Sequence, residues 1–130
     1  MDYINLESVI FKNDEHEDNF TNIIAARMSS TDEFHLAAAY LLALPEIYPH
    51  FDSLFDTLSD SIKPDGLRDA WQTGSTTRAC RLAFNLWNGY AWSNDGEEIS
   101  ADYSPYFLFC DSNAPYFWQA IKLRYPEYCE

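Results

Sequence analysis

The sequence predicts an all-α fold, a compact single-domain bundle of about five to seven helices over residues 1–130, and three observations support this. The chain has 130 residues, a length that suits one hydrophobic core. Hydrophobic residues make up 47% of it and there are only four glycines, which disfavours both disorder and a many-turned β fold. Apolar residues recur at helical spacing, and no useful stretch alternates apolar and polar residues as a strand would.

The N-terminal part of the chain predicts a lead-in followed by two helices. Residues 1–12 are expected to be extended and to dock on the body of the protein. A helix is predicted over 13–28, because acids occupy its opening turns, where the helix dipole favours negative charge. A second helix is predicted over 30–44, starting with a capping box between Ser30 and Glu33. Its surface is almost entirely apolar, which predicts that it is the central helix.

A third helix is predicted between Pro49 and Pro64. Proline is accepted in the first turn of a helix and disfavours helix at the residue before it, so the two prolines suit its two ends. Asp52, Asp56 and Asp60 recur every four residues within it. This spacing predicts three carboxylates stacked in line on one helix face.

The C-terminal half predicts further helices rich in aromatic residues. The expected elements are a turn at 63–66, a short helical piece at 67–71, a long helix at 74–88, a surface loop at 93–102, a short helix from 104 and a last helix from 113 to 125. Gly89 is placed to end the long helix. Thirteen of the 22 aromatic residues lie between Phe84 and Tyr128. The C-terminal half is therefore expected to be aromatic and nearly neutral.

Charge is distributed unevenly along the chain. The net charge is −13; residues 1–65 hold thirteen acids against three bases, and residues 66–130 hold eight against five. Because attraction to phosphate dominates binding to nucleic acids and anionic membranes, this balance excludes direct partners of both kinds. It favours a basic protein as the partner. No apolar run is long enough to cross a bilayer and no leader segment is visible, so we expect a cytoplasmic protein.

The acids of the first half are the candidate partner-binding residues. Four residues along a helix advance about 6 Å, comparable to the spacing of phosphates along a nucleic-acid strand. An extended carboxylate surface of this kind would fit the basic groove of a nucleic-acid-binding protein. The candidate residues are Asp52, Asp56, Asp60, Asp14, Glu15, Glu17 and Asp18. The leading hypothesis is therefore a non-catalytic acidic binding protein; the plainer interpretation is a solvated helix face.

The start of the 74–88 helix is a candidate anion site. Hydroxyls, free backbone N–H groups and arginines coincide there, as in phosphate sites at helix N-termini. The residues concerned are Ser75, Thr76, Thr77 and Arg78. The segment Gly74–Arg81 lacks the glycines and lysine of a P-loop, so the alternatives are an anion-responsive regulator or enzyme and a capped helix whose arginines pair with acids such as Asp69.

The sequence identifies no catalytic residues, no metal site and no cofactor. No nucleophile elbow is present, and three widely spaced cysteines fit neither a disulfide framework nor a zinc site. Cys80 and Cys110 are expected in the core. Asp32 and His35 are three apart on one helix face, but a di-iron site needs that pairing twice. The three histidines are instead expected to be exposed.

Several aromatic motifs carry a resemblance to a known family. They are the runs 63–67 (KPDGL), 71–73 (WQT), 81–89 (RLAFNLWNG), 105–109 (PYFLF), 114–118 (APYFW) and 120–128 (AIKLRYPEY). Over about residues 60–128 the chain resembles a family of short Firmicutes proteins of unknown function, often encoded near phage and mobile-element genes. The family has no assigned activity, so no functional residues carry over.

The resemblance implies a bacterial or phage context, in which small acidic inhibitors of host defence, such as anti-CRISPR proteins and nucleic-acid mimics, are common. A nuclease or a CRISPR effector is then the expected basic partner. The competing hypothesis from a different class is an interaction or scaffold module that uses the aromatic half, since tyrosine and tryptophan are favoured at the centres of interfaces.

Overall fold

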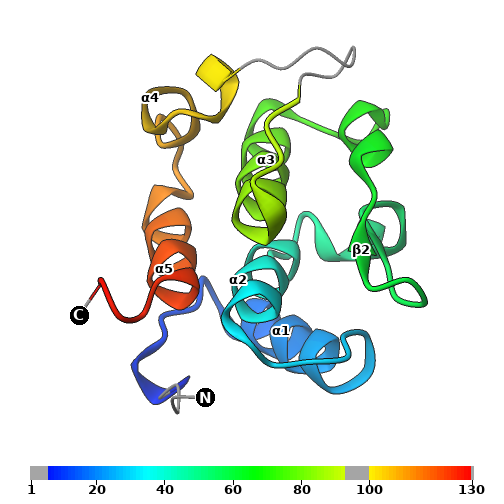
Figure 1. The fold of residues 1–130 in the computed structure, drawn as a ribbon, viewed down its shortest axis with the longest axis vertical. Coiled ribbons are helices and arrows are strands. Elements are labelled where there is room, and N and C mark those ends of the chain that lie inside the picture. The colour runs from blue at the N-terminus through cyan, green and yellow to red at the C-terminus, as the bar shows by residue number, and fades with distance from the viewer. Residues whose placement is uncertain (1–5, 93–99, 130) are drawn as a thin grey trace.

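The apolar helix α2 (Glu33–Leu42) lies at the centre of the fold, as the sequence predicts. The computed structural model describes residues 6–92 and 100–129. Helix α2 packs most extensively against α3 (Gly74–Asn88), then against α5 (Ala114–Arg124) and α1 (Asp14–Ala26) (Figure 1). All residues from 36 to 44 are buried, which explains why this segment has no polar face.

The described residues are mostly helical, in agreement with the predicted fold class. Besides the four helices above, they form the one-turn helix α4 (Pro105–Leu108). Four 3-10 helices complete the helical part: η1 (Leu6–Ser8), η2 (Tyr48–Ser53), η3 (Pro64–Arg68) and η4 (Ser100–Tyr103). A two-stranded antiparallel sheet, β1 (Phe55–Asp56) and β2 (Ser61–Ile62), is an element of a kind that the sequence did not predict. No helix of the described residues is both long and apolar enough to span a membrane.

Side-chain caps fix the starts of the long helices. The Asn13 side chain accepts a hydrogen bond from the backbone N–H of His16 at the start of α1. Helix α2 is capped by Asp32, so the predicted capping box of Ser30 and Glu33 is wrong; the Asp32 carboxylate accepts from the N–H of His35. Aspartate and serine are comparable N-caps, and here the later one is used.

The predicted helix between Pro49 and Pro64 does not form. Residues 48–53 make the 3-10 helix η2, and the chain then turns back as a hairpin in which Phe55 pairs with Ile62. Half of the residues from 51 to 64 are Ser, Thr or Asp, whose side chains compete with the helix for backbone hydrogen bonds. Asp56 is an example, since its carboxylate accepts from the backbone N–H groups of Leu58 and Ser59.

The N-terminal lead-in docks on the body of the protein through partly buried hydrogen bonds. Its predicted extended form holds only in part, because Leu6–Ser8 is a 3-10 helix; residues 1–5, like residues 93–99 of the predicted loop, lie outside the described residues. The Tyr40 hydroxyl donates to the Ile10 carbonyl at 2.6 Å, and the Ile10 N–H donates to the Gln119 side chain at 3.0 Å. These bonds connect the lead-in to α2 and α5.

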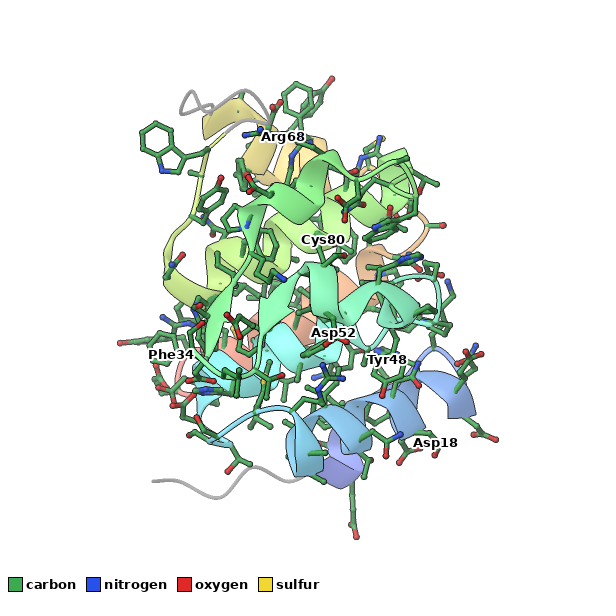
Figure 2. All side chains as sticks on the ribbon, turned by 90° about the vertical axis from the view of Figure 1, so that its right-hand side faces the viewer. Asp18, Phe34, Tyr48, Asp52, Arg68 and Cys80 are labelled. Carbon is green, nitrogen blue, oxygen red and sulfur yellow. The ribbon has the colours of Figure 1, made fainter. Side chains whose placement is uncertain are left out.

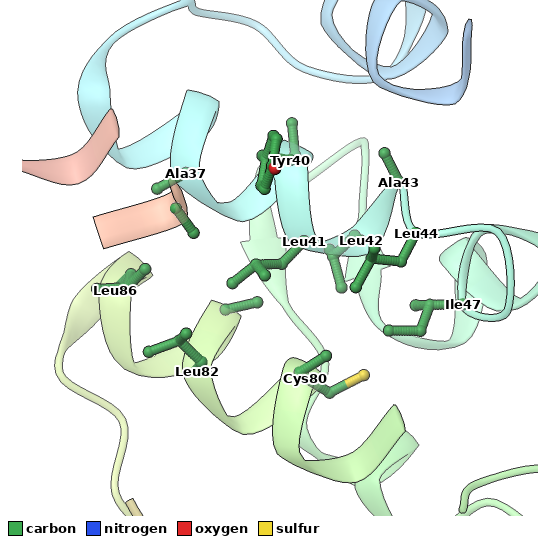
Figure 3. Packing of buried hydrophobic residues seen from close by; sticks show 14 of the residues in the cluster. Ala37, Tyr40, Leu41, Leu42, Ala43, Leu44, Ile47, Cys80, Leu82 and Leu86 are labelled. Carbon is green, nitrogen blue, oxygen red and sulfur yellow. The ribbon is translucent and has the colours of Figure 1, made fainter. Parts of the chain in front are cut away.

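One hydrophobic core joins the helices. Leu41 and Leu42 of α2 meet Cys80, Leu82 and Leu86 of α3 in it, as Figure 3 shows. Cys80 is buried as predicted, whereas Cys110, which was also expected in the core, is exposed just after α4. Burial raises the pKa of the Cys80 thiol to about 12, so that this cysteine stays protonated and unreactive at neutral pH.

Candidate functional site

The predicted row of Asp52, Asp56 and Asp60 does not exist, because the helix that would carry it does not form. Asp52 is in η2, Asp56 is in β1, and Asp60 is in the turn that follows, with a positive φ of 54°. Asp52 forms an ion pair with Arg27, and Asp60 contacts the imidazole of His35. The Asp56 carboxylate accepts backbone hydrogen bonds from Leu58 and Ser59, so all three carboxylates have partners within the protein, and they do not stack on one helix face.

The acids of α1 are arranged differently. Asp14, Glu15, Glu17 and Asp18 are all exposed in its first two turns, while the buried side of this part of the helix is formed by His16, Asn19 and Phe20. Within the described residues, none of the four acids forms an ion pair. Figure 2 shows Asp18 toward the N-terminal end of α1, on a different part of the surface from Asp52. The α1 carboxylates therefore remain available to a partner.

The cations of the chain are largely engaged by the protein itself. Seven of the eight Lys and Arg side chains make a hydrogen bond, ion pair or cation–π contact within the described residues. The contacts are Lys12 with Glu46, Arg27 with Asp52, Lys63 with the Asp52 carbonyl, Arg78 with Asp111, Arg81 with Asp102, Lys122 with the Trp118 ring, and Arg124 with the Phe34 ring. Most of the Lys and Arg side chains thus contact other groups of the protein and, in the part of the chain that the structure describes, none pairs with the α1 acids, so the α1 surface is strongly negative.

The candidate anion site at the start of α3 holds a carboxylate of the protein. Thr73 caps the helix, in a capping box with Thr76. Asp111 accepts hydrogen bonds from the Ser75 hydroxyl at 3.1 Å and from Arg78 at 3.0 Å, and its side chain is only 2% exposed. Of the predicted residues, Ser75 and Arg78 converge on this carboxylate, while Thr76 and Thr77 bond to Gln72. The arrangement corresponds to the capped, arginine-paired helix, with Asp111 in the place of Asp69.

Exposed aromatic side chains gather in the C-terminal part of the chain. Of the eight large hydrophobic side chains that are exposed in the described residues, six are aromatic and lie between residues 92 and 128. They are Trp92, Tyr106, Phe107, Trp118, Tyr125 and Tyr128. Tyr106 is 81% exposed and Trp118 50%. Part of the aromatic content of the C-terminal half therefore lies on the surface of the protein and not in its core.

His16 and His35 are buried and His50 is half-buried, contrary to the expectation that all three histidines are exposed. His16 accepts from the Lys12 N–H through Nδ1 at 3.0 Å, so its Nε2 carries the proton and donates to the Tyr40 carbonyl at 2.8 Å. Burial lowers the pKa of His16, which keeps this ring neutral. His50 is half-buried and stacks on Trp71, with ring centroids 4.0 Å apart.

The third histidine, His35, lies between two carboxylates and is the site that sequence reasoning missed. Its Nδ1 is 2.7 Å from the Asp32 carboxylate, and its Nε2 is 2.9 Å from that of Asp60. The three-residue spacing of Asp32 and His35 was visible in the sequence. It was compared only with a di-iron site, which needs this pairing twice, so no site was predicted. The described residues contain no group of three or more His, Cys, Asp or Glu side chains placed to hold a metal ion.

Comparison with known proteins assigns a family but no activity. Searches of the curated proteins and of the solved structures each gave no match. A family model described as a family of unknown function (DUF6075) matches residues 6–130, so the similarity extends over the acidic first half as well as the aromatic motifs. The match covers nearly the whole chain, and the chain belongs to this family of unknown function.

Proposed function

We propose that the protein is a non-catalytic acidic binding protein that docks on a basic partner through the carboxylates at the start of α1. The observation that supports the proposal is the contrast between Asp14, Glu15, Glu17 and Asp18, which are exposed and unpaired within the described residues, and the cations, nearly all of which are engaged internally. A basic partner would supply the positive charges that the four α1 acids lack within the fold.

The fold itself gains little from these four acids together. Residues three and four apart on a helix are neighbours, so Asp14 with Glu17, Asp14 with Asp18, and Glu15 with Asp18 are three repulsive pairs. Each costs a few tenths of a kcal/mol, which offsets much of what the helix dipole contributes in the first turn. Recognition by a basic partner therefore accounts for these four carboxylates better than helix stability does.

More specifically, we propose that the partner is a nucleic-acid-binding protein, such as a nuclease or a CRISPR effector. The protein would then be a cytoplasmic inhibitor from a phage or mobile element. A carboxylate surface then takes the place of phosphates in a basic groove. Such contacts are electrostatic, so they weaken as salt rises. No direct contact with nucleic acid or membrane is part of this proposal.

We expect that neutralising two α1 acids weakens partner binding about tenfold. The variant is Glu15→Gln with Asp18→Asn, and the loss corresponds to two exposed ion pairs. The matched control is Asp65→Asn with Glu127→Gln, which removes the same charge from exposed positions in η3 and after α5. The partner is isolated from host lysate with the wild-type protein and purified, and its affinity for each variant is then measured across a salt series by calorimetry.

Two outcomes of this experiment contradict the proposal. If the control pair weakens binding as much as the α1 pair, only the overall charge matters and α1 is not the docking site. If neither pair changes the affinity and salt has no effect, the charge-based proposal is wrong.

The exposed aromatic surface supports a second candidate function, an interaction or scaffold module. Six exposed aromatic side chains between residues 92 and 128 favour it, because aromatic residues dominate the centres of interfaces. In the same assay, Trp92→Ser and Tyr106→Ser separate the two functions. A scaffold loses affinity with these substitutions and keeps it with Glu15→Gln and Asp18→Asn.

A further inference from the structure

His35 brings together three elements that are distant in the sequence. Its imidazole, at the start of α2, contacts Asp32 before the same helix and Asp60 in the hairpin turn, 25 residues away. The imidazole ring is nearly perpendicular to the Trp87 ring of α3, with an interplanar angle of 83° and centroids 4.7 Å apart. Only 8% of the His35 side chain is exposed.

The geometry requires that both ring nitrogens carry a proton. A neutral imidazole has one N–H and one lone pair, so one of its nitrogens would set a lone pair against a carboxylate oxygen. The distances of 2.7 Å to Asp32 and 2.9 Å to Asp60 are those of charge-assisted hydrogen bonds. The imidazolium satisfies both carboxylates at once.

The charged groups that face His35 are the same two acids. Burial lowers the pKa of His35, but the hydrogen bonds and negative charges of Asp32 and Asp60 outweigh it, and the pKa is raised. Among the described residues, the group of α3 that contacts His35 is the uncharged ring of Trp87. A raised pKa extends the protonated range of His35 above about 6.5, the value of an unperturbed histidine.

The hairpin turn has few other anchors. Leu58 is 99% exposed, so residues 57–60 bury no large apolar side chain there. Their local order comes from the Asp56 carboxylate and from a contact between the Ser59 and Ser61 hydroxyls, both within the hairpin. Within the described part of the chain, the turn makes two long-range hydrogen bonds: the Asp60 carboxylate accepts one from His35, and the exposed Thr57 hydroxyl accepts one from Arg27.

We propose that protonated His35 is a latch that fixes the hairpin turn, residues 57–60, to the start of α2, and that loss of its proton releases the turn. When the proton leaves Nε2, that nitrogen presents a lone pair to the Asp60 carboxylate, and the attraction becomes a repulsion. The stems of the hairpin stay in place, because Phe55 and the β1–β2 pairing do not depend on His35. The positions of Asp56 and Leu58 on the surface thereby become sensitive to pH.

The sign of the effect follows from the raised pKa of His35. The latch is fully formed below about pH 6.5, where His35 is protonated even in the unfolded chain, and it is lost as pH rises through the folded-state pKa. This inference does not depend on the proposed function, because it concerns no residue of α1.

The test uses NMR on the purified protein. The ¹⁵N signals of the His35 ring, followed from about pH 6 to about pH 9, report its protonation directly. Hydrogen exchange of backbone amides in residues 57–61, expressed as protection factors, reports the turn. We expect both ring nitrogens to be protonated at the lower pH, and protection in the turn to fall about tenfold as one proton is lost, the scale of one charge-assisted hydrogen bond.

Two variants give the matched comparison. Asp60→Asn removes the charge that the latch needs, and its turn should show low protection at both pH values. Asp65→Asn removes an exposed acid elsewhere and should behave like the wild type. The proposal is overturned if His35 has a single ring N–H at about pH 6, or if protection in the turn is unchanged while His35 titrates. The wild-type titration decides the question even if a variant fails to fold.

Discussion

Gly66→Ala is expected to lower the free energy of unfolding by about 3 kcal/mol, the upper range for overpacking of a buried site. Gly66 is buried in η3, and a β-carbon there would lie 2.3 Å from the backbone oxygen of Ser53 and 2.7 Å from a methyl group of Leu54. The first contact is with backbone at the end of η2, and the neighbouring Leu54 is fully buried, so neither can move aside cheaply. Urea unfolding followed by circular dichroism measures the loss.

Gly74→Ala is the control for this prediction. Gly74 is the first residue of α3, and a β-carbon at this position would have the Arg78 side chain as its nearest neighbour, at 3.6 Å or more. Alanine is a better helix former than glycine by up to about 1 kcal/mol, so the variant should be unchanged or slightly more stable. If Gly66→Ala proved as stable as Gly74→Ala, η3 and η2 would separate without cost, contrary to the packing described above.

The helices could be predicted from the sequence where local signals agree. Over 74–88, the apolar spacing and the glycine at the end indicate the same element, and Gly89 ends α3 with a φ of 80°. Over 49–64 the apolar spacing indicated a helix, while the Ser, Thr and Asp content indicated turns. The prediction was based on this spacing and on the two flanking prolines. The outcome depended on hydrogen bonds such as those accepted by Asp56, which neither signal reports.

The candidate sites were less predictable because their partners are remote in the chain. Asp111 is 33 residues from Arg78, and Asp60 is 25 residues from His35. Net charge indicated that carboxylates are in excess, but not which of them the fold would use for itself. The α1 acids kept their predicted exposure because the inward side of α1 is specified locally by His16, Asn19 and Phe20.

Leu41→Ala is expected to destabilise the protein by about 3 kcal/mol, within the range measured for leucine deletion from tightly packed cores. Leu41 is fully buried in α2, which packs against α3, α5 and α1 (Figure 3). Truncation removes apolar burial and leaves a cavity in the core, which the surrounding structure closes only partly. The measurement is the free energy of unfolding from urea titration, with the slope compared to the wild type to confirm that the unfolded states are alike.

Leu58→Ala is the matched control, since the same atoms are removed from the tip of the hairpin. Leu58 is 99% exposed, so the change in stability should stay within about 0.5 kcal/mol. Because the leucine-to-alanine change is identical at both positions, the difference between their losses of unfolding free energy reports the effect of burial. A large loss at Leu58 would mean that the turn packs against the body in solution. The latch formed by His35 would then not be the main anchor of the turn.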